Sequence, residues 1–109
     1  MIRAVGIDVV ETSRIIEAME SNERFASRIL TPRELERKVT PSYLAGRWAA
    51  KEAVAKAVGT HLTWQDLEIL EGEGGRPTVS FLEHRPEGKV HVSISHDNTL
   101  ASAVAIWEE

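Results

Sequence analysis

The spacing of apolar residues changes from a helical to a strand-like period at Gly59. Over Ser42–Val58, apolar positions cover a broad helical face and six residues are alanine, the strongest helix former. Thr40 and Pro41 suit the N-cap and first helical position, and Gly59 suits the C-terminal stop. The pattern therefore predicts a long central helix.

Shorter elements precede this helix. Apolar residues on both faces of Ile2–Val10 predict a strand. Thr12 and Asn22 suit the caps of two short amphipathic helices. Thr31-Pro-Arg-Glu34 matches a capping box and predicts a third short helix that ends near Lys38 or Val39.

After Gly59 the period is two, and glycine- or proline-containing turns separate the apolar segments. Short turns between successive strands favour antiparallel pairing. The predicted fold class is α+β, with an antiparallel sheet packed with a long central helix and short N-terminal helices. The final strand is apolar on both faces, so either the chain covers both or one face meets another subunit. The predicted strands are Asp66–Leu70, Thr78–Leu82, Lys89–Ser95 and Leu100–Trp107.

At 109 residues the chain has the length of one domain, so we expect a single domain over residues 1–109. Its 42% hydrophobic and 28% charged residues are typical of ordered globular proteins. The sequence has no cysteine, which excludes disulfides and thiolate metal sites, and its apolar runs are too short to cross a bilayer. With no signal-like apolar block, it predicts a cytoplasmic protein without a membrane partner.

The net charge of −4 is unevenly distributed. Residues 60–109 carry three basic and nine acidic side chains, whereas residues 41–59 carry three basic and one acidic. The acidic second half argues against nucleic-acid binding, which needs an extended basic surface. It leaves room for a local anion site around the central helix.

Asp8 is the only charged residue in Ala4–Val10, a strand segment that is apolar on both faces. A buried carboxylate without a partner is costly. The residues leave two interpretations open: Asp8 caps or pairs with a neighbouring group, or it binds a metal ion.

Four charged residues of the central helix, Arg47, Lys51, Glu52 and Lys56, fall within about half of its circumference. Arg47 and Lys51 are like charges one turn apart, a spacing that costs about 0.2–0.5 kcal/mol. They form either a solvated face or a polyanion site, where two cations suit phosphate oxygens and the carboxylate suits a divalent cation. The helix alone leaves both interpretations open.

Arg24 and Arg28 are one turn apart in the second short helix, and Arg14 lies on the polar side of the first. These arginines are either solvated or form a basic ridge for an acidic partner.

Several segments, taken together and in order, make the chain resemble the holo-acyl-carrier-protein synthases, small bacterial phosphopantetheinyl transferases. The strongest are Gly6-Ile-Asp-Val-Val-Glu11 and Trp48-Ala-Ala-Lys-Glu-Ala-Val-Ala-Lys-Ala57. Supporting segments are Arg28-Ile-Leu-Thr31, Tyr43-Leu-Ala-Gly-Arg47, Gly75-Arg-Pro77 and Val92-Ser-Ile-Ser-His96.

The resemblance implies transfer of the phosphopantetheine arm of coenzyme A to a serine of acyl carrier protein, with adenosine 3',5'-bisphosphate as by-product, for fatty acid biosynthesis. It implies that Asp8 and Glu52 hold Mg²⁺ and that Lys56 faces the attacked phosphate, these three being the catalytic residues. The implied coenzyme A site consists of Arg47, Lys51, Lys56, Gly59, Arg76, Pro77, Ser95 and His96.

The resemblance also implies a homotrimer with active sites between subunits, and docking of the acidic carrier protein on Arg14, Arg24 and Arg28. It leaves the base for the serine open between His96, a carboxylate in residues 34–36 and a metal-bound water, with His96 favoured as an anion contact. In the connection that often binds the 3'-phosphate, only Arg37 and Lys38 are basic here.

Overall fold

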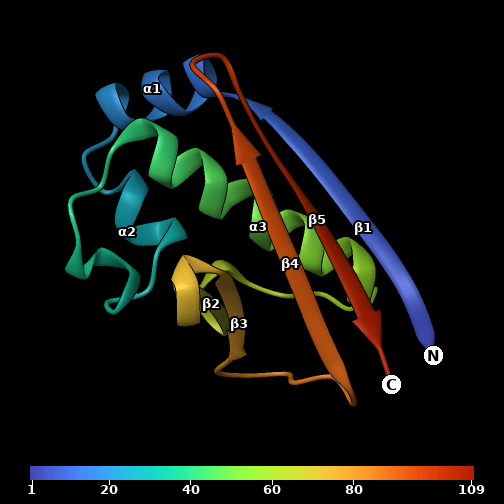
Figure 1. Cartoon of the computed structure of the whole chain (residues 1–109). Helices are drawn as coiled ribbons and strands as arrows, with labels where there is room; N and C mark the ends of the chain where they lie inside the picture. The colour runs from blue at the N-terminus through green and yellow to red at the C-terminus, as the bar shows by residue number, and fades with distance from the viewer.

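The computed structural model describes residues 1–109 and has the α+β composition that the sequence predicts (Figure 1). The central helix, its N-cap Thr40 and its left-handed stop at Gly59 all lie where predicted. In chain order the elements are β1 Ile2–Glu11, α1 Thr12–Ser21, α2 Phe25–Ile29, η1 Glu34–Glu36, α3 Pro41–Val58, η2 Trp64–Asp66, β2 Leu67–Glu71, η3 Glu73–Gly75, β3 Pro77–Phe81, β4 Lys89–His96 and β5 Leu100–Glu108.

The strands form two antiparallel sheets, a larger one in the order β1-β5-β4 and the hairpin β2-β3. The N-terminal strand joins the larger sheet, as expected, and β5 is its central strand. The expectation of one sheet is wrong, because the successive strands β3 and β4 do not pair with each other. Figure 1 shows the three long strands side by side and the hairpin standing apart.

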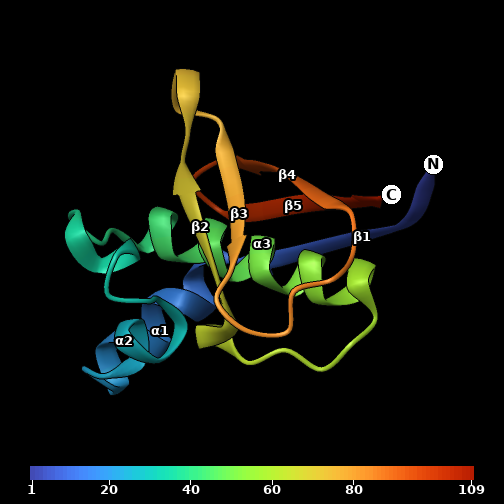
Figure 2. The same ribbon diagram turned by 90° about the horizontal axis from the view of Figure 1, so that it is seen from below.

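Helix α3 packs against one face of the larger sheet and forms the centre of the core. Figure 2 shows α3 beneath the sheet, with the β2-β3 hairpin rising beside β4. Buried alanines of α3 face Ala103 and Ala105 of β5. The approach is closest at Gly6, where an added Cβ would lie 2.7 Å from the backbone nitrogen of Ala57 and closer still to the Ala53 carbonyl oxygen.

The opposite face of this sheet is exposed and partly apolar. Val5, Ile7 and Val9 of β1 are 59%, 66% and 61% exposed, and Ile106 and Val104 of β5 lie beside the first two. The chain therefore covers only one face of β5. None of the helices combines the length and the hydrophobicity that crossing a bilayer requires.

The N-terminal helical segments differ from the expected ones in detail. Thr12 is the first helical residue of α1 rather than its cap, and its hydroxyl is buried without a partner. The Asn22 side chain accepts from the Arg24 N–H and so caps the turn before α2. The capping box Thr31–Glu34 forms, but only one 3-10 turn follows, because the Glu34 carboxylate is held by residues distant in sequence and the backbone is extended at Arg37.

Candidate functional site

Asp8 and Lys56 form an ion pair where β1 crosses α3. The Lys56 ammonium donates to a carboxylate oxygen of Asp8 at 3.1 Å and to the backbone oxygen of Ile7 at 3.0 Å. The side chain of Asp8 is only 15% exposed, whereas that of Lys56 is 55% exposed. Asp8 therefore has the partner that its place in the strand requires, and the lysine still faces solvent.

Glu52 lies one turn before Lys56 on α3 and is half-buried. It follows from the close contact at Gly6 that β1 runs directly over the Ala53–Ala57 turn, which places Asp8 and Glu52 on neighbouring segments. No group of three or more His, Cys, Asp or Glu side chains is arranged as a metal site. These two acids alone give a divalent cation few protein ligands.

A basic cleft lies beside the N-terminal half of α3. Its first lobe, about 410 Å³, and its second, about 290 Å³, share Arg37, Tyr43, Arg47 and Glu71. The guanidinium carbons of Arg37 and Arg47 lie 4.2 and 4.5 Å from the centroid of the Tyr43 ring. Burial raises the pKa of the Tyr43 hydroxyl, so the ring stays neutral under both cations. Arg33 and Lys38 add positive charge to the first lobe, and Glu36 and Glu71, the latter paired with Arg37 at 3.1 Å, offset part of it.

The second lobe brings together three residues that the resemblance assigned to coenzyme A: Arg47, Pro77 and His96. Pro77 starts β3 and His96 ends β4, so the lobe lies where the two sheets approach α3. Ser95 is exposed and points to the other face of β4 than His96. Gly59 lies at the far end of α3, away from this lobe.

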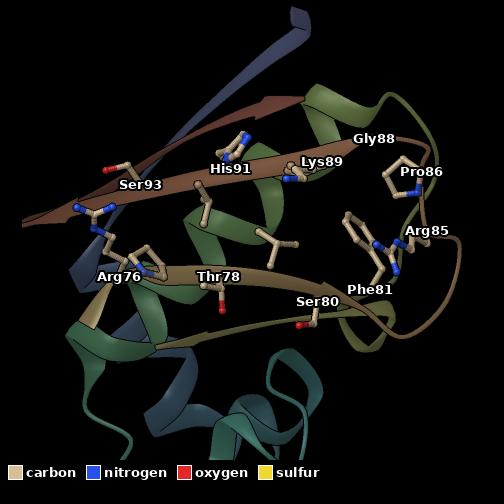
Figure 3. Close-up of a pocket in the computed structure, with 14 residues that line it drawn as sticks. Arg76, Thr78, Ser80, Phe81, Arg85, Pro86, Gly88, Lys89, His91 and Ser93 are labelled. Carbon is tan, nitrogen blue, oxygen red and sulfur yellow. The ribbon is translucent and has the colours of Figure 1, made fainter. Parts of the chain in front are cut away.

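Arg76 lies instead in the largest cavity, a groove of about 700 Å³ between β3 and β4 (Figure 3). In Figure 3, Arg76 and Ser93 lie at one end and Phe81 and Arg85 at the other. The groove and the second lobe meet at Pro77. We place the candidate site in the basic cleft rather than in this groove, because the cleft contains Arg47 and His96.

Lys51 does not lie on an accessible face with Arg47, which corrects the sequence expectation. Its side chain is 1% exposed and its ammonium donates to the Glu34 carboxylate at 2.7 Å and to the backbone oxygens of Ile29 and Trp64. Burial lowers the pKa of Lys51, although Glu34 opposes this. All three N–H groups are used, so this ammonium has none left for a ligand.

The Asp8–Lys56 pair and the basic cleft lie on different sides of α3. Arg47 and Lys56 are nine residues apart, which is about 14 Å along the axis and about half a turn around it. Asp8 is on β1 and His96 on β4, the two edge strands of the sheet. The helix therefore separates the two groups of predicted site residues within one chain.

Arg14 on α1, Arg24 in the turn just before α2 and Arg28 on α2 are exposed, and none of them makes an ion pair. Arg24 therefore lies outside the helix in which the sequence placed it. The end of α2 is held by Gln65, whose side-chain amide donates to the backbone oxygens of Ser27, Arg28 and Leu30 at 3.0–3.2 Å. The two helices and the turn between them thus present three cations without acidic neighbours bonded to them.

Sequence reasoning missed Tyr43, Glu34 and Gln65 as residues that shape these sites. Glu34 gave a partial signal, because its capping box was recognised, but a cap does not predict a buried ion pair. Tyr43 lies four residues before Arg47, where an aromatic ring can support a cation. Gln65 has no local pattern to mark it.

Comparisons with known proteins place the chain in one family. Residues 4–105 match the family model described as the 4'-phosphopantetheinyl transferase superfamily. The chain is 44% identical to a holo-[acyl-carrier-protein] synthase of Geobacillus kaustophilus, over 99% of this chain and 90% of that protein. That alignment spans 119 positions, so this chain is the shorter of the two.

Two solved structures are similar over nearly their whole length. One is a holo-(acyl-carrier-protein) synthase of Bacillus anthracis in complex with CoA (3',5'-ADP), with a TM-score of 0.88, 35% identity and coverage of 100% of this chain and 98% of that one. The other is the synthase of Neisseria meningitidis, with a TM-score of 0.89, 34% identity and full coverage of both chains. The resemblance read from the sequence is confirmed.

Proposed function

Because the chain belongs to the 4'-phosphopantetheinyl transferase superfamily and to its holo-[acyl-carrier-protein] synthases, we propose that it transfers 4'-phosphopantetheine from coenzyme A to a serine of apo-acyl carrier protein. The serine oxygen bonds to the pantetheine-bearing phosphorus of the pyrophosphate. The bond from this phosphorus to the bridging oxygen breaks, and adenosine 3',5'-bisphosphate leaves. The observation that carries the proposal is the end-to-end match with these synthases.

Asp8 and Glu52 suit Mg²⁺ by their chemistry, since both are hard oxygen donors on adjoining segments. Mg²⁺ is commonly held by one or two carboxylates, with waters and substrate phosphates in the remaining positions. Two protein ligands are therefore enough if the pyrophosphate completes the set. When bound, the ion supplies positive charge that stabilises the leaving phosphate.

Lys56 is the cation best placed to contact the attacked phosphate, because its exposed ammonium is already fixed by Asp8 and the Ile7 carbonyl. Holding this charge in place before the substrate arrives favours the transition state. The proton of the serine passes to a base. Glu34 does not fit that role because its carboxylate is fully buried and occupied, which leaves His96, Glu36 or a water.

The basic cleft suits the adenosine 3',5'-bisphosphate part of coenzyme A. Arg37, Lys38 and Arg47 supply charge for phosphates, and Pro77 and His96 border the adjoining lobe. Arg76, Ser95 and Gly59 remain proposed contacts, and Lys51 is left out because its ammonium is enclosed.

A homotrimer with sites between subunits would unite the two groups of residues that α3 separates. The contact would join the β1 side of one subunit to the β4 side of the next, and a head-to-tail contact of this kind closes into a ring of three when each subunit is rotated by one third of a turn. The exposed apolar side chains Val5, Ile7 and Val9 support this assembly, since monomers rarely expose such a patch. The oligomeric mass, measured by light scattering, tests it.

Mixing variants tests the shared site more directly. Asp8→Ala and Arg47→Ala each damage a different half of it, so subunits of the two variants, unfolded and reassembled together, regain intact sites. Random mixing restores about one quarter of the wild-type activity in a ring with shared sites. If the site lies within one chain, the mixture stays as inactive as its components.

The exposed arginines Arg14, Arg24 and Arg28 suit the acidic carrier protein, because unpaired cations steer and orient a partner of opposite charge. The cytoplasmic location and the role in fatty acid biosynthesis stay predictions. Both depend on the proposed substrates.

One incubation tests the reaction: the protein with coenzyme A, Mg²⁺ and apo-carrier protein, followed by mass spectrometry of the carrier. A mass increase equal to phosphopantetheine is expected, and it is lost in Asp8→Ala and Glu52→Ala and after chelation of Mg²⁺. Glu83→Ala, an exposed acid with no ion pair, is the matched control and stays active. Binding of coenzyme A without transfer would indicate a non-catalytic binding subunit. The absence of both binding and transfer would indicate a structural oligomer.

A further inference from the structure

The Glu34 carboxylate is fully buried and accepts three hydrogen bonds. One oxygen accepts from the Thr31 N–H at 2.8 Å and from the Lys51 ammonium at 2.7 Å. The other accepts from the Ile69 N–H at 2.8 Å. A group bonded to three different segments fixes their relative positions.

Two of the connections from Glu34 lead into the basic cleft. The Ile69 carbonyl, in the residue whose N–H is held by Glu34, accepts from Nε of Arg47 at 3.0 Å. The Glu34 backbone carbonyl accepts from the Tyr43 hydroxyl at 2.8 Å, and the Tyr43 ring supports the guanidiniums of Arg37 and Arg47. Both supports of Arg47 thus pass through residue 34, one through its carboxylate and one through its backbone carbonyl.

We propose that Glu34 is a positioning residue for coenzyme A, holding Arg47 and Tyr43 in the geometry that binds the anionic end of this substrate. The inference rests on the function proposed above. Glu34 touches no substrate. It orders the cleft in advance, and binding then loses less conformational entropy. Lys51 balances the buried charge and completes the same network.

The substitution Glu34→Gln tests the proposal with little change in shape. An amide has to turn its NH₂ group toward one of the three donors that the carboxylate accepts. If the NH₂ group faces Ile69, it opposes a single backbone N–H. If it takes the place of the other oxygen, it opposes two donors, the Thr31 N–H and the charged Lys51 ammonium. The amide therefore displaces Ile69, and Arg47 loses its anchor. We expect the Kd for coenzyme A, measured by calorimetry, to rise about tenfold, with kcat changed less than about twofold.

Asp66→Asn is the matched control. Asp66 is also buried and its carboxylate accepts from the Thr63 N–H, but its side chain contacts no residue that lines the basic cleft. It should lower the melting temperature as Glu34→Gln does and leave the Kd for coenzyme A within about twofold. Equal effects of both variants on the Kd would overturn the positioning role.

A double-mutant cycle asks whether Glu34 acts through Arg47. In the Arg47→Ala background, Glu34→Gln should add less than about twofold to the Kd, because the group it positions is gone. Additive effects overturn the proposal. If Glu34→Gln does not fold, Glu34→Asp replaces it, since it keeps the charge beside Lys51 but shortens the reach to the Ile69 N–H; a raised Kd then supports the proposal and an unchanged one overturns it.

Measurements on the wild-type protein distinguish failure of the positioning role from failure of the proposed function on which it rests. If it binds no coenzyme A, the proposed function and the positioning role fail together. If it binds coenzyme A and transfers the arm, but the cycle is additive, only the positioning role fails.

Discussion

Replacing Gly6 with alanine should move β1 away from α3. The new Cβ would lie 2.7 Å from the backbone nitrogen of Ala57, and ordinary contact begins at 3.4 Å, so strand and helix have to separate by at least 0.7 Å. Backbone atoms cannot rotate out of the way as a side chain can. Overpacking of this kind costs about 1–3 kcal/mol, and we expect the upper end of this range.

For a chain of this size, about 3 kcal/mol corresponds to a melting temperature lower by roughly 10–15 °C. The same displacement lengthens the 3.1 Å contact between the Lys56 ammonium and Asp8 beyond hydrogen-bond range. Transfer should therefore fall in Gly6→Ala even at temperatures where the variant is folded. Circular dichroism on heating and the mass-spectrometric transfer assay measure the two effects.

Gly46→Ala is the natural control because Gly46 lies on α3, the helix that Gly6 packs against, and the substitution makes the same chemical change. Its Cβ would meet only Cγ2 of the Ile94 side chain, at 3.2 Å, which can yield. Alanine also stabilises a helix interior by about 0.5–1 kcal/mol relative to glycine. Its melting temperature should stay the same or rise. If Gly6→Ala melts within about 2 °C of the wild type and transfers normally, the close packing of β1 on α3 does not position the site.

Three further outcomes follow from the buried and capping groups. Lys51→Met leaves the Glu34 carboxylate buried without its counter-ion and should cost about 3–5 kcal/mol in urea unfolding, and a loss below 1 kcal/mol would contradict the buried pair. Gln65→Ala frees the carbonyls at the end of α2, the helix that carries Arg28, and should raise the KM for the carrier protein while the KM for coenzyme A stays constant. A rise in both KM values would assign Gln65 another role. The backbone N–H of Thr63 holds the pKa of Asp66 below its usual value, so the stability from this carboxylate is present at neutral pH and lost as the pH falls below about 4. Asp66→Asn should therefore show a smaller drop in melting temperature between pH 7 and pH 3, and an equal drop would rule out this contribution.

The sequence predicted the features that depend on neighbours along the chain. Thr40, Pro41 and Gly59 bound α3 as expected because capping and the left-handed stop are set within one turn. The four strands of the second half lie within one residue of their predicted bounds because side-chain alternation is local. Which strands pair depends on the path of the chain between them, and the sequence did not predict that β3 and β4 would lie in different sheets.

The candidate site shows the same division. Asp8 was recognised as a carboxylate that needs a partner, and the structure supplies Lys56. Lys51 was misplaced because a helical wheel shows only which side of the helix a residue occupies. The segments that enclose it come from Ile29, Glu34 and Trp64, and only the folded chain brings them together.

The position of β5 in the middle of the sheet has a consequence for synthesis on the ribosome. Its partners in β1 precede it by 89 to 106 residues, so β1 gains no strand neighbour until β5 has emerged. Until then Val5, Ile7 and Val9 are part of an unpaired strand edge, the kind of segment that associates with other chains. Such distant pairing also slows folding. A nascent chain that stalls before Leu100 should therefore be captured by chaperones, whereas one released after Glu108 can close the sheet in a single step.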